Sequence, residues 1–92
     1  MSGTVLAFDF GLKKTGAASG ELEIGVAHPL TTIQADSRPA RFAAIDKLVA
    51  EWRPALLVVG LPLHPDGAEH EMTRAARNFA SELESRYQLP VF

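Results

Sequence analysis

The sequence predicts a single α/β domain, residues 1–92, in which helices pack against a mixed β-sheet. Residues 4–10 and 55–60 form nearly continuous apolar runs, which are typical of buried central strands. Residues 42–52 and 68–86 carry apolar side chains at helical spacing. The predicted order of elements is therefore β-β-β-α-β-α-β, with the last strand incomplete where the sequence ends.

The first three strands are expected to form an antiparallel meander. The first strand is closed by Gly11 and carries one acid, Asp9, at its C-terminal end. The second covers residues 15–19, and the third covers residues 22–29 and could reach Ile33. The dipeptide Gly20-Glu21 is the expected tight turn between these two strands.

Helix signals bound the second half of the chain. Asp36-Ser37-Arg38-Pro39 combines a capping side chain with a proline in the first turn, and Pro54 ends that helix. Residues 61–67 form a loop, and Asp66 with Glu69 resembles a capping box for the second helix. Residues 88–92 begin a further strand, which should pair beside residues 55–59.

Composition excludes several classes of protein. The absence of cysteine rules out a disulfide scaffold, a thiolate metal site and a cysteine nucleophile. A net charge of −2 argues against a strongly basic surface, although a small basic site remains compatible with it. The sequence shows no signal peptide, and its longest apolar run is too short for a bilayer, so we expect a cytoplasmic protein without a membrane partner.

Asp9 is the first candidate for chemistry. A carboxylate at the end of an apolar central strand is costly unless a cation, a lysine or a helix N-terminus holds it. Mg²⁺ prefers one or two carboxylates together with waters and substrate phosphates, so Asp9 could be a ligand of such an ion. The alternative is an aspartate that only helps Gly11 to turn the chain, and the residues alone favour neither interpretation.

Basic residues near Asp9 and on the second helix are candidates for nucleic-acid binding. Residues 11–16 contain half of a phosphate loop, but Ala17 stands where a P-loop needs lysine. Lys13 and Lys14 could contact phosphates or simply solvate a turn, and Arg74 and Arg77 could contact a nucleic-acid backbone or simply form a solvated helix face.

Two further segments carry weaker signals. Residues 58–63 lead from a strand into a loop before a helix, where ligands of open α/β sheets bind. His64, Asp66 and His70 do not have the spacing that would place both imidazoles on one helix face, so a metal site there is disfavoured.

These segments together resemble the YqgF family, also described as RuvX-type Holliday junction resolvases or pre-16S rRNA nucleases. The resemblance covers the whole chain. It is carried by residues 6–13 with Gly16, by residues 58–63 followed by Asp66-Gly67, and by His28-Pro29-Leu30 in the third strand. Either of the first two motifs alone is moderately specific for this family. Both of them together, at this separation and in this order, are strongly specific for it.

The resemblance implies an RNase H-like fold and a nuclease that uses Mg²⁺ or Mn²⁺ on structured nucleic acid, either an rRNA precursor or branched DNA. It places Asp9 at the family's first catalytic, metal-binding carboxylate and Lys13 at the lysine of an Asp-x-Gly-x-Lys motif. Gly60, Leu61 and Pro62 match the loop that shapes the active-site edge, and Gly11 belongs to the same edge.

The sequence departs from the family at its end. Family members continue into an Asp-Glu-Arg motif and a later aspartate on a C-terminal helix, and this sequence ends before both. We therefore expect the 92-residue chain alone to be inactive, and to be marginally stable or self-associated through its incomplete C-terminal edge. The alternatives are a non-catalytic RNase H-like module that binds nucleic acid or protein, and a fragment of an actin-like or sugar-kinase-like ATPase.

Overall fold

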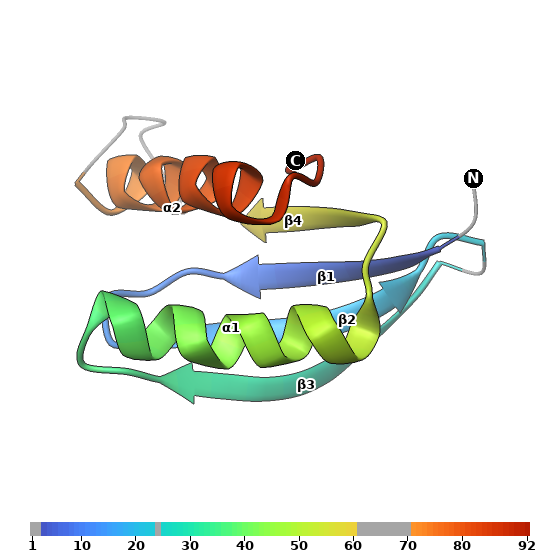
Figure 1. The fold of residues 1–92 in the computed structure, drawn as a ribbon, viewed down its shortest axis with the longest axis horizontal. Coiled ribbons are helices and arrows are strands. Elements are labelled where there is room, and N and C mark those ends of the chain that lie inside the picture. The colour runs from blue at the N-terminus through green and yellow to red at the C-terminus, as the bar shows by residue number, and fades with distance from the viewer. Residues whose placement is uncertain (1–2, 24, 61–70) are drawn as a thin grey trace, which may run out of the picture.

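The computed structural model describes residues 3–23, 25–60 and 71–92, and it shows a four-stranded mixed sheet with two helices (Figure 1). The strand order is β3-β2-β1-β4, in which β1 pairs antiparallel with β2 and parallel with β4. The predicted α/β class is confirmed. The elements in chain order are β1 (Thr4–Asp9), β2 (Lys14–Glu21), β3 (Val26–Gln34), α1 (Arg38–Trp52), β4 (Leu56–Gly60) and α2 (Glu71–Tyr87).

The central strand β1 has two chemically different faces. Leu6 and Phe8 point toward the helices and are almost fully buried, with relative exposures of 0% and 2%. Ala7 and Asp9 alternate with them and point to the opposite face, because successive side chains of a strand alternate. One strand therefore supplies the core on one side and a candidate site residue on the other.

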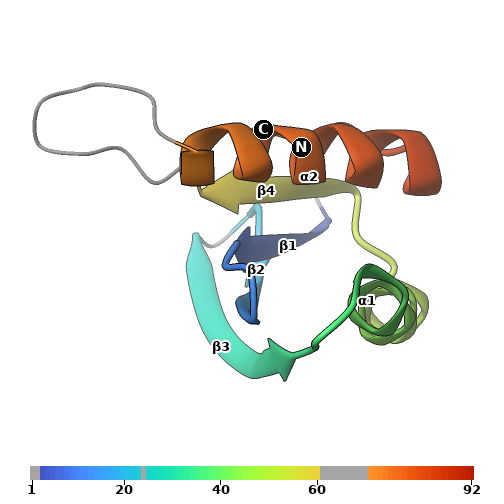
Figure 2. The same ribbon diagram turned by 90° about the vertical axis from the view of Figure 1, so that its left-hand side faces the viewer.

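Both helices pack on the Phe8 face of the sheet (Figure 2). The ring of Phe79 on α2 stacks on Phe10 with centroids 4.7 Å apart and meets Phe8 edge-on at 6.0 Å. It also lies 6.0 Å from Phe42 of α1. This aromatic cluster joins β1, α1 and α2, so the opposite face of the sheet is left without a helix among the described residues.

The turn between β2 and β3 differs from the sequence prediction. β2 continues through Gly20 and Glu21, which pair with Ala27 and Val26, so the predicted turn at Gly20-Glu21 is wrong. The chain reverses between Glu21 and Val26, and the Gly25 amide donates to the carbonyl of Glu21 at 2.9 Å. The reason is conformational: Gly25 has a φ of 65°, which glycine adopts at little cost.

The helix α1 begins and ends where its sequence signals predict. The Ser37 hydroxyl accepts a hydrogen bond from the Ala40 amide at 3.2 Å, which satisfies one of the unpaired donors of the first turn. At the other end, Arg53 adopts a left-handed conformation and its amide donates to Val49, directly before Pro54.

The C-terminal residues pair beside β4, as predicted, although they form a single bridge and not a strand. Val91 forms a parallel bridge with Leu57 of β4. The Leu57 amide donates to Pro90 at 2.9 Å, and the Val59 amide donates to Phe92 at 2.8 Å. Residues 61–70 lie outside the described residues, and with them the predicted loop and the capping box of Asp66. Neither described helix is long and apolar enough to cross a membrane.

Polar contacts also join the two helices. Arg86 of α2 donates to both carboxylate oxygens of Asp46 on α1, at 3.0 and 2.9 Å, and the Tyr87 hydroxyl donates to the same carboxylate at 2.6 Å. The hydrogen bonds from Arg86 and then Tyr87 lower the pKa of Asp46 from its ordinary value of 3.8 to about 2. A second ion pair joins Arg38 to Glu82.

We predict that Asp46→Asn destabilises the protein in a pH-dependent manner. Because the pKa of Asp46 is lower in the folded state, the contribution of its carboxylate is fully present above about pH 5 and is lost as the pH falls toward 2. We expect a loss of about 1 kcal/mol in the free energy of unfolding at pH 7, a small value because solvent screens this half-exposed pair.

Urea unfolding at pH 7, 5 and 3 measures this difference. The exposed Glu51 lies on the same helix, so Glu51→Gln is the matched control and should stay within about 0.5 kcal/mol of the parent protein. A deficit of Asp46→Asn that is the same at pH 3 as at pH 7 would contradict the assignment.

Candidate functional site

Asp9 lies at the C-terminal end of β1, on the sheet face that the helices leave open. Its partners in register are Gly16 on β2 and Gly60 on β4. The Asp9 residue is exposed, and its carboxylate makes no ion pair within the part of the chain that the structure describes. The sequence analysis singled out Asp9 because a buried charge is costly. Since Asp9 is exposed, that cost does not apply to it.

Both strand neighbours of Asp9 are glycines, which carry no side chain beside the carboxylate. A Cβ placed on Gly16 would lie 3.7 Å from the Asp9 Cβ, and one on Gly60 would lie 3.9 Å from the Phe8 carbonyl oxygen. Both distances are ordinary contacts, so these positions do not need glycine for steric reasons. Their effect is to leave the strands on both sides of Asp9 bare, so that a ligand can approach the carboxylate from the open face.

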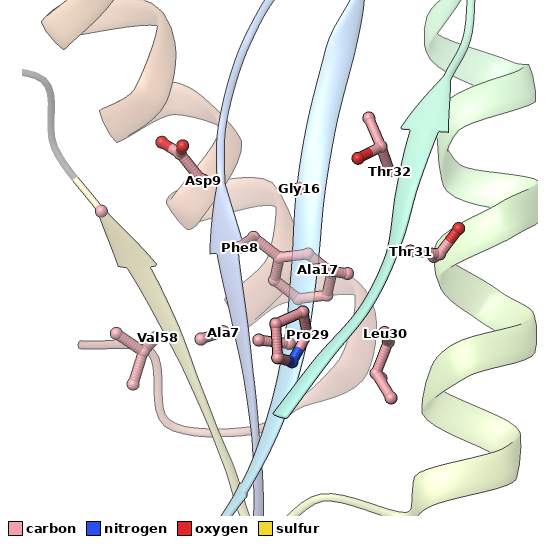
Figure 3. A pocket seen from close by; sticks show the side chains of 12 residues that line it. Ala7, Phe8, Asp9, Gly16, Ala17, Pro29, Leu30, Thr31, Thr32 and Val58 are labelled. Carbon is pink, nitrogen blue, oxygen red and sulfur yellow. The ribbon is translucent and has the colours of Figure 1, made fainter. Parts of the chain in front are cut away.

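A groove of about 600 Å³ extends from Asp9 across the open face of the sheet (Figure 3). Asp9 and Thr32 stand toward one end of this groove, while Ala7, Val58 and Pro29 lie toward the other. Small and apolar side chains make up most of its floor. The groove therefore has one charged end, and Asp9 supplies its charge.

The loop that follows Asp9 is tied down by contacts with its own hairpin and with the end of β3. A Cβ on Gly11 would lie 2.4 Å from the Lys14 carbonyl oxygen, so this position needs glycine. The buried Thr15 hydroxyl donates to the Gly11 carbonyl at 3.4 Å. The Ala35 amide donates to the Lys13 carbonyl at 3.1 Å. The backbone that carries the candidate lysines is thereby fixed from several directions.

Lys13 and Lys14 lie together beside this site. Both side chains are exposed and line a shallow cavity of about 310 Å³ with Gln34, Ala35 and Asp36. Within the described ranges neither lysine forms an ion pair. Their ammonium groups are therefore available to an anionic ligand that approaches the end of the sheet where Asp9 lies.

The other predicted binding residues are placed differently. Arg77 lines a separate cavity with Val59, Val91 and Phe92, at the edge of β4 away from β1. Arg74 is exposed one turn earlier on α2. The structure does not bring these arginines together with the lysines. Leu61 and Pro62 of the predicted active-site loop lie outside the described residues.

Arg41 is a residue of this region that the sequence analysis missed. Its guanidinium, on the first turn of α1, donates to the carbonyl oxygens of Gly11 and Leu12. It also lies 5.0 Å from the centre of the Phe10 ring. No spacing rule connects this arginine with a loop some 30 residues earlier, so only the folded structure shows the contact.

Asp9 is suited to be one ligand of a hard divalent cation. Asp9 presents an exposed carboxylate to open space, and such a carboxylate with waters and a phosphate can complete the octahedral shell of Mg²⁺. Among the described residues, no group of three His, Asp or Glu side chains could hold a metal. Cleavage with two metals needs several carboxylates, so Asp9 would be one member of a larger set.

A mixed sheet in the order β3-β2-β1-β4, with a carboxylate at the end of its central strand, places this chain in the RNase H-like class of α/β proteins. Comparison with family models narrows the class. Residues 3–92 match the model of RuvX, described as a Holliday junction resolvase, and the chain belongs to this family.

Curated relatives are similar over nearly the whole chain. Proteins named "Putative pre-16S rRNA nuclease" from Thiobacillus denitrificans and Dechloromonas aromatica are 71% and 63% identical over 90 and 89 residues. The one from Neisseria gonorrhoeae is 53% identical over 90 residues. These matches cover 98%, 97% and 98% of this chain but 62%, 61% and 60% of the relatives. The chain thus spans about three fifths of their length.

We predict opposite effects for the same substitution at two glycines of this site. Gly11→Ala forces a methyl group against the Lys14 carbonyl and should lower the free energy of unfolding by about 1–3 kcal/mol. Gly16→Ala meets only ordinary contacts and should be neutral or raise stability by about 0.5 kcal/mol, because alanine reduces the freedom of the unfolded chain.

Thermal and urea unfolding of the two variants provide the measurement, with each variant as the control for the other. Equal stabilities of Gly11→Ala and Gly16→Ala would show that the loop after Asp9 is looser than its contacts indicate.

Proposed function

We propose that this chain forms the metal-binding core of a nuclease that cleaves phosphodiester bonds in structured nucleic acid. The observation that carries the proposal is the exposed Asp9 carboxylate between Gly16 and Gly60, at the end of the central strand. The RuvX match and the nuclease name of the relatives support it. An rRNA precursor is the first substrate to test, since the relatives' name refers to 16S rRNA, and a DNA junction is the second.

The distribution of charge in this protein favours attraction of nucleic acid at one site and not over the whole surface. The chain carries a net charge of −2, so it does not attract a polyanion over its whole surface. Lys13 and Lys14 lie at the end of the sheet where Asp9 pairs with Gly16, although Asp36 lines the same cavity as the lysines. In the proposed mechanism these lysines hold the phosphate backbone, and Asp9 contributes its carboxylate at the scissile group.

Asp9 would hold Mg²⁺ or Mn²⁺, which polarises a phosphodiester and lowers the pKa of an attacking water. Its exposure on the open face leaves room for the ion's waters and for a phosphate. Because no group of three His, Asp or Glu side chains among the described residues could hold a metal, we further propose that the 92-residue chain alone does not cleave. A non-catalytic binding module is the second candidate, favoured by that same observation. The RuvX match over residues 3–92 does not support the other alternative, a fragment of an actin-like or sugar-kinase-like ATPase.

We predict that Asp9→Asn abolishes cleavage without harming the fold. Asparagine keeps the shape of the side chain but removes the anionic ligand, so the rate should fall by at least about 100-fold. The test replaces the matched 90-residue segment of the Thiobacillus denitrificans relative by this chain, and measures cleavage of an rRNA precursor and of a four-way DNA junction with Mg²⁺ or Mn²⁺.

Asp36→Asn is the matched control, because it removes the same charge from an exposed position beside the lysines. Its cleavage rate should stay within about threefold of the parent, and the melting temperature of Asp9→Asn should hold or rise. Full metal-dependent cleavage by Asp9→Asn would refute the proposed role of Asp9. An inactive parent chimera that still binds nucleic acid would favour the binding module.

We predict that Lys13→Ala weakens nucleic-acid binding regardless of sequence. Loss of one phosphate contact should reduce the slope of log K against log salt concentration by about one unit. Fluorescence anisotropy with two RNA duplexes of different sequence, each at several salt concentrations, measures this slope. Lys47→Ala, on an exposed part of α1, should leave the slope unchanged. Identical slopes for both variants would show that Lys13 does not contact a phosphate.

A further inference from the structure

The backbone at Lys13 lies between two peptide groups that distant parts of the chain hold in place. The carbonyl of the preceding peptide, that of Leu12, accepts a hydrogen bond from the guanidinium of Arg41. The carbonyl of Lys13 itself accepts one from the Ala35 amide at 3.1 Å. Each peptide group is planar, so fixing the peptides on both sides limits the φ and ψ angles of Lys13. These two angles determine the direction in which the lysine side chain leaves the loop.

The contact from Arg41 connects this loop to the core of the protein. Arg41 lies in the first turn of α1, and its guanidinium also donates to the Gly11 carbonyl at 3.5 Å. The same guanidinium lies 5.0 Å from the centre of the Phe10 ring, which stacks on Phe79 of α2 at 4.7 Å. Arginine is suited to this position because its donors lie in one rigid plane that also stacks on aromatic rings.

The side chain of Lys13 has few other constraints. It is exposed, and no ion pair holds its ammonium group among residues 3–23, 25–60 and 71–92. Asp36 lines the same shallow cavity, but it is not paired with either lysine there. A lysine ammonium is a point charge on a flexible stem. The direction of the backbone is therefore what limits the space that the ammonium group can reach.

We propose that Arg41 is a positioning residue for Lys13. By holding the Leu12 carbonyl, it keeps the Lys13 ammonium directed toward a phosphate group of nucleic acid at the end of the sheet where Asp9 lies. The inference rests on the proposed function, from which it takes the contact between Lys13 and a phosphate. Arg41 is assigned no phosphate contact of its own, because its half-buried guanidinium faces the loop carbonyls and the Phe10 ring.

A double-mutant cycle between Arg41 and Lys13 tests this dependence. Fluorescence anisotropy without metal measures the affinity for an RNA duplex of the parent chain, Arg41→Gln, Lys13→Ala and the double variant. If Arg41 acts through Lys13, Arg41→Gln should weaken binding about fivefold in the parent but less than about twofold in the Lys13→Ala background. Equal fold-changes in the two backgrounds would show that Arg41 contributes independently of Lys13, and the inference would be wrong.

The salt dependence of binding provides a second reading of the same cycle. Each single variant should lower the slope of log K against log salt concentration by about one unit, since each loses the same phosphate contact. The double variant should also lose about one unit, whereas a loss of about two units would show that Arg41 binds a phosphate directly. Lys47→Gln is the matched control, because it removes the same charge from an exposed position on the same helix. It should change affinity less than about twofold.

Arg41→Lys separates positioning from charge. It keeps the positive charge but lacks the planar group that bonds the carbonyls and stacks on Phe10, so it should recover only part of the affinity that Arg41→Gln loses. All affinities are measured at a temperature at which circular dichroism shows the variants folded. Parental affinity of Arg41→Lys would show that only the charge matters. Parental affinity of Arg41→Gln with a lowered melting temperature would show that Arg41 only supports the fold. Either result would overturn the inference.

The Asp9→Asn variant distinguishes this inference from the proposed function. The coupling between Arg41 and Lys13 does not need the carboxylate, so it should persist in Asp9→Asn. Cleavage that survives Asp9→Asn would refute the proposed role of Asp9 and leave the coupling standing. RNA binding that is absent, or that Lys13→Ala does not change, would refute this inference and leave the role of Asp9 in cleavage standing.

Discussion

The packing of Phe79 against three other phenylalanine rings holds both helices against one face of the sheet. Phe79 stacks on Phe10, meets Phe8 edge-on and lies beside Phe42, with ring centroids between 4.7 and 6.0 Å. Each such pair contributes about 0.5–1.5 kcal/mol beyond the burial of its area. Because the rings come from β1, from Phe10 directly after it, and from α1 and α2, their packing brings both helices to one face of the sheet.

The open face is a direct consequence of that packing. Side chains of β1 alternate, so burying Leu6 and Phe8 beneath the helices places Ala7 and Asp9 on the other side. A slip of one residue in register would exchange the two sets and bury the carboxylate. The aromatic core therefore stabilises the domain and also keeps Asp9 accessible. The bare backbones of Gly16 and Gly60 widen that access.

The same cluster extends to the loop that carries the basic residues. Phe10 lies between Phe79 and Arg41, and Arg41 in turn holds the carbonyls of the loop before Lys13. A protein with a net negative charge can still present an ordered basic site in this way, since only a few groups need to be placed. The proposed attraction of nucleic acid would then act at one end of the sheet, where the candidate metal ligand also lies.

The sequence by itself determined the elements and the most informative residue of the site. Continuous apolar runs predicted β1 and β4, Ser37 with Pro39 predicted the start of α1, and Asp9 stood out as the acid that closes β1. These signals are local, because periodicity, capping and strand ends depend on neighbours in the chain. The reversal between Glu21 and Val26 was missed, since Gly20 and Gly25 both allow a turn and only the pairing of β2 with β3 selects between them.

Only the tertiary structure decided which residues meet. The pairing of Asp9 with Gly16 and Gly60 depends on strand register, and the separation of Arg77 from the lysines depends on the side of α2 that faces the sheet edge. The contact of Arg41 with the loop after Asp9 requires α1 to pack beside that loop. Such contacts join residues far apart in sequence, and the packing of the core selects them, so no local pattern in a single sequence encodes them.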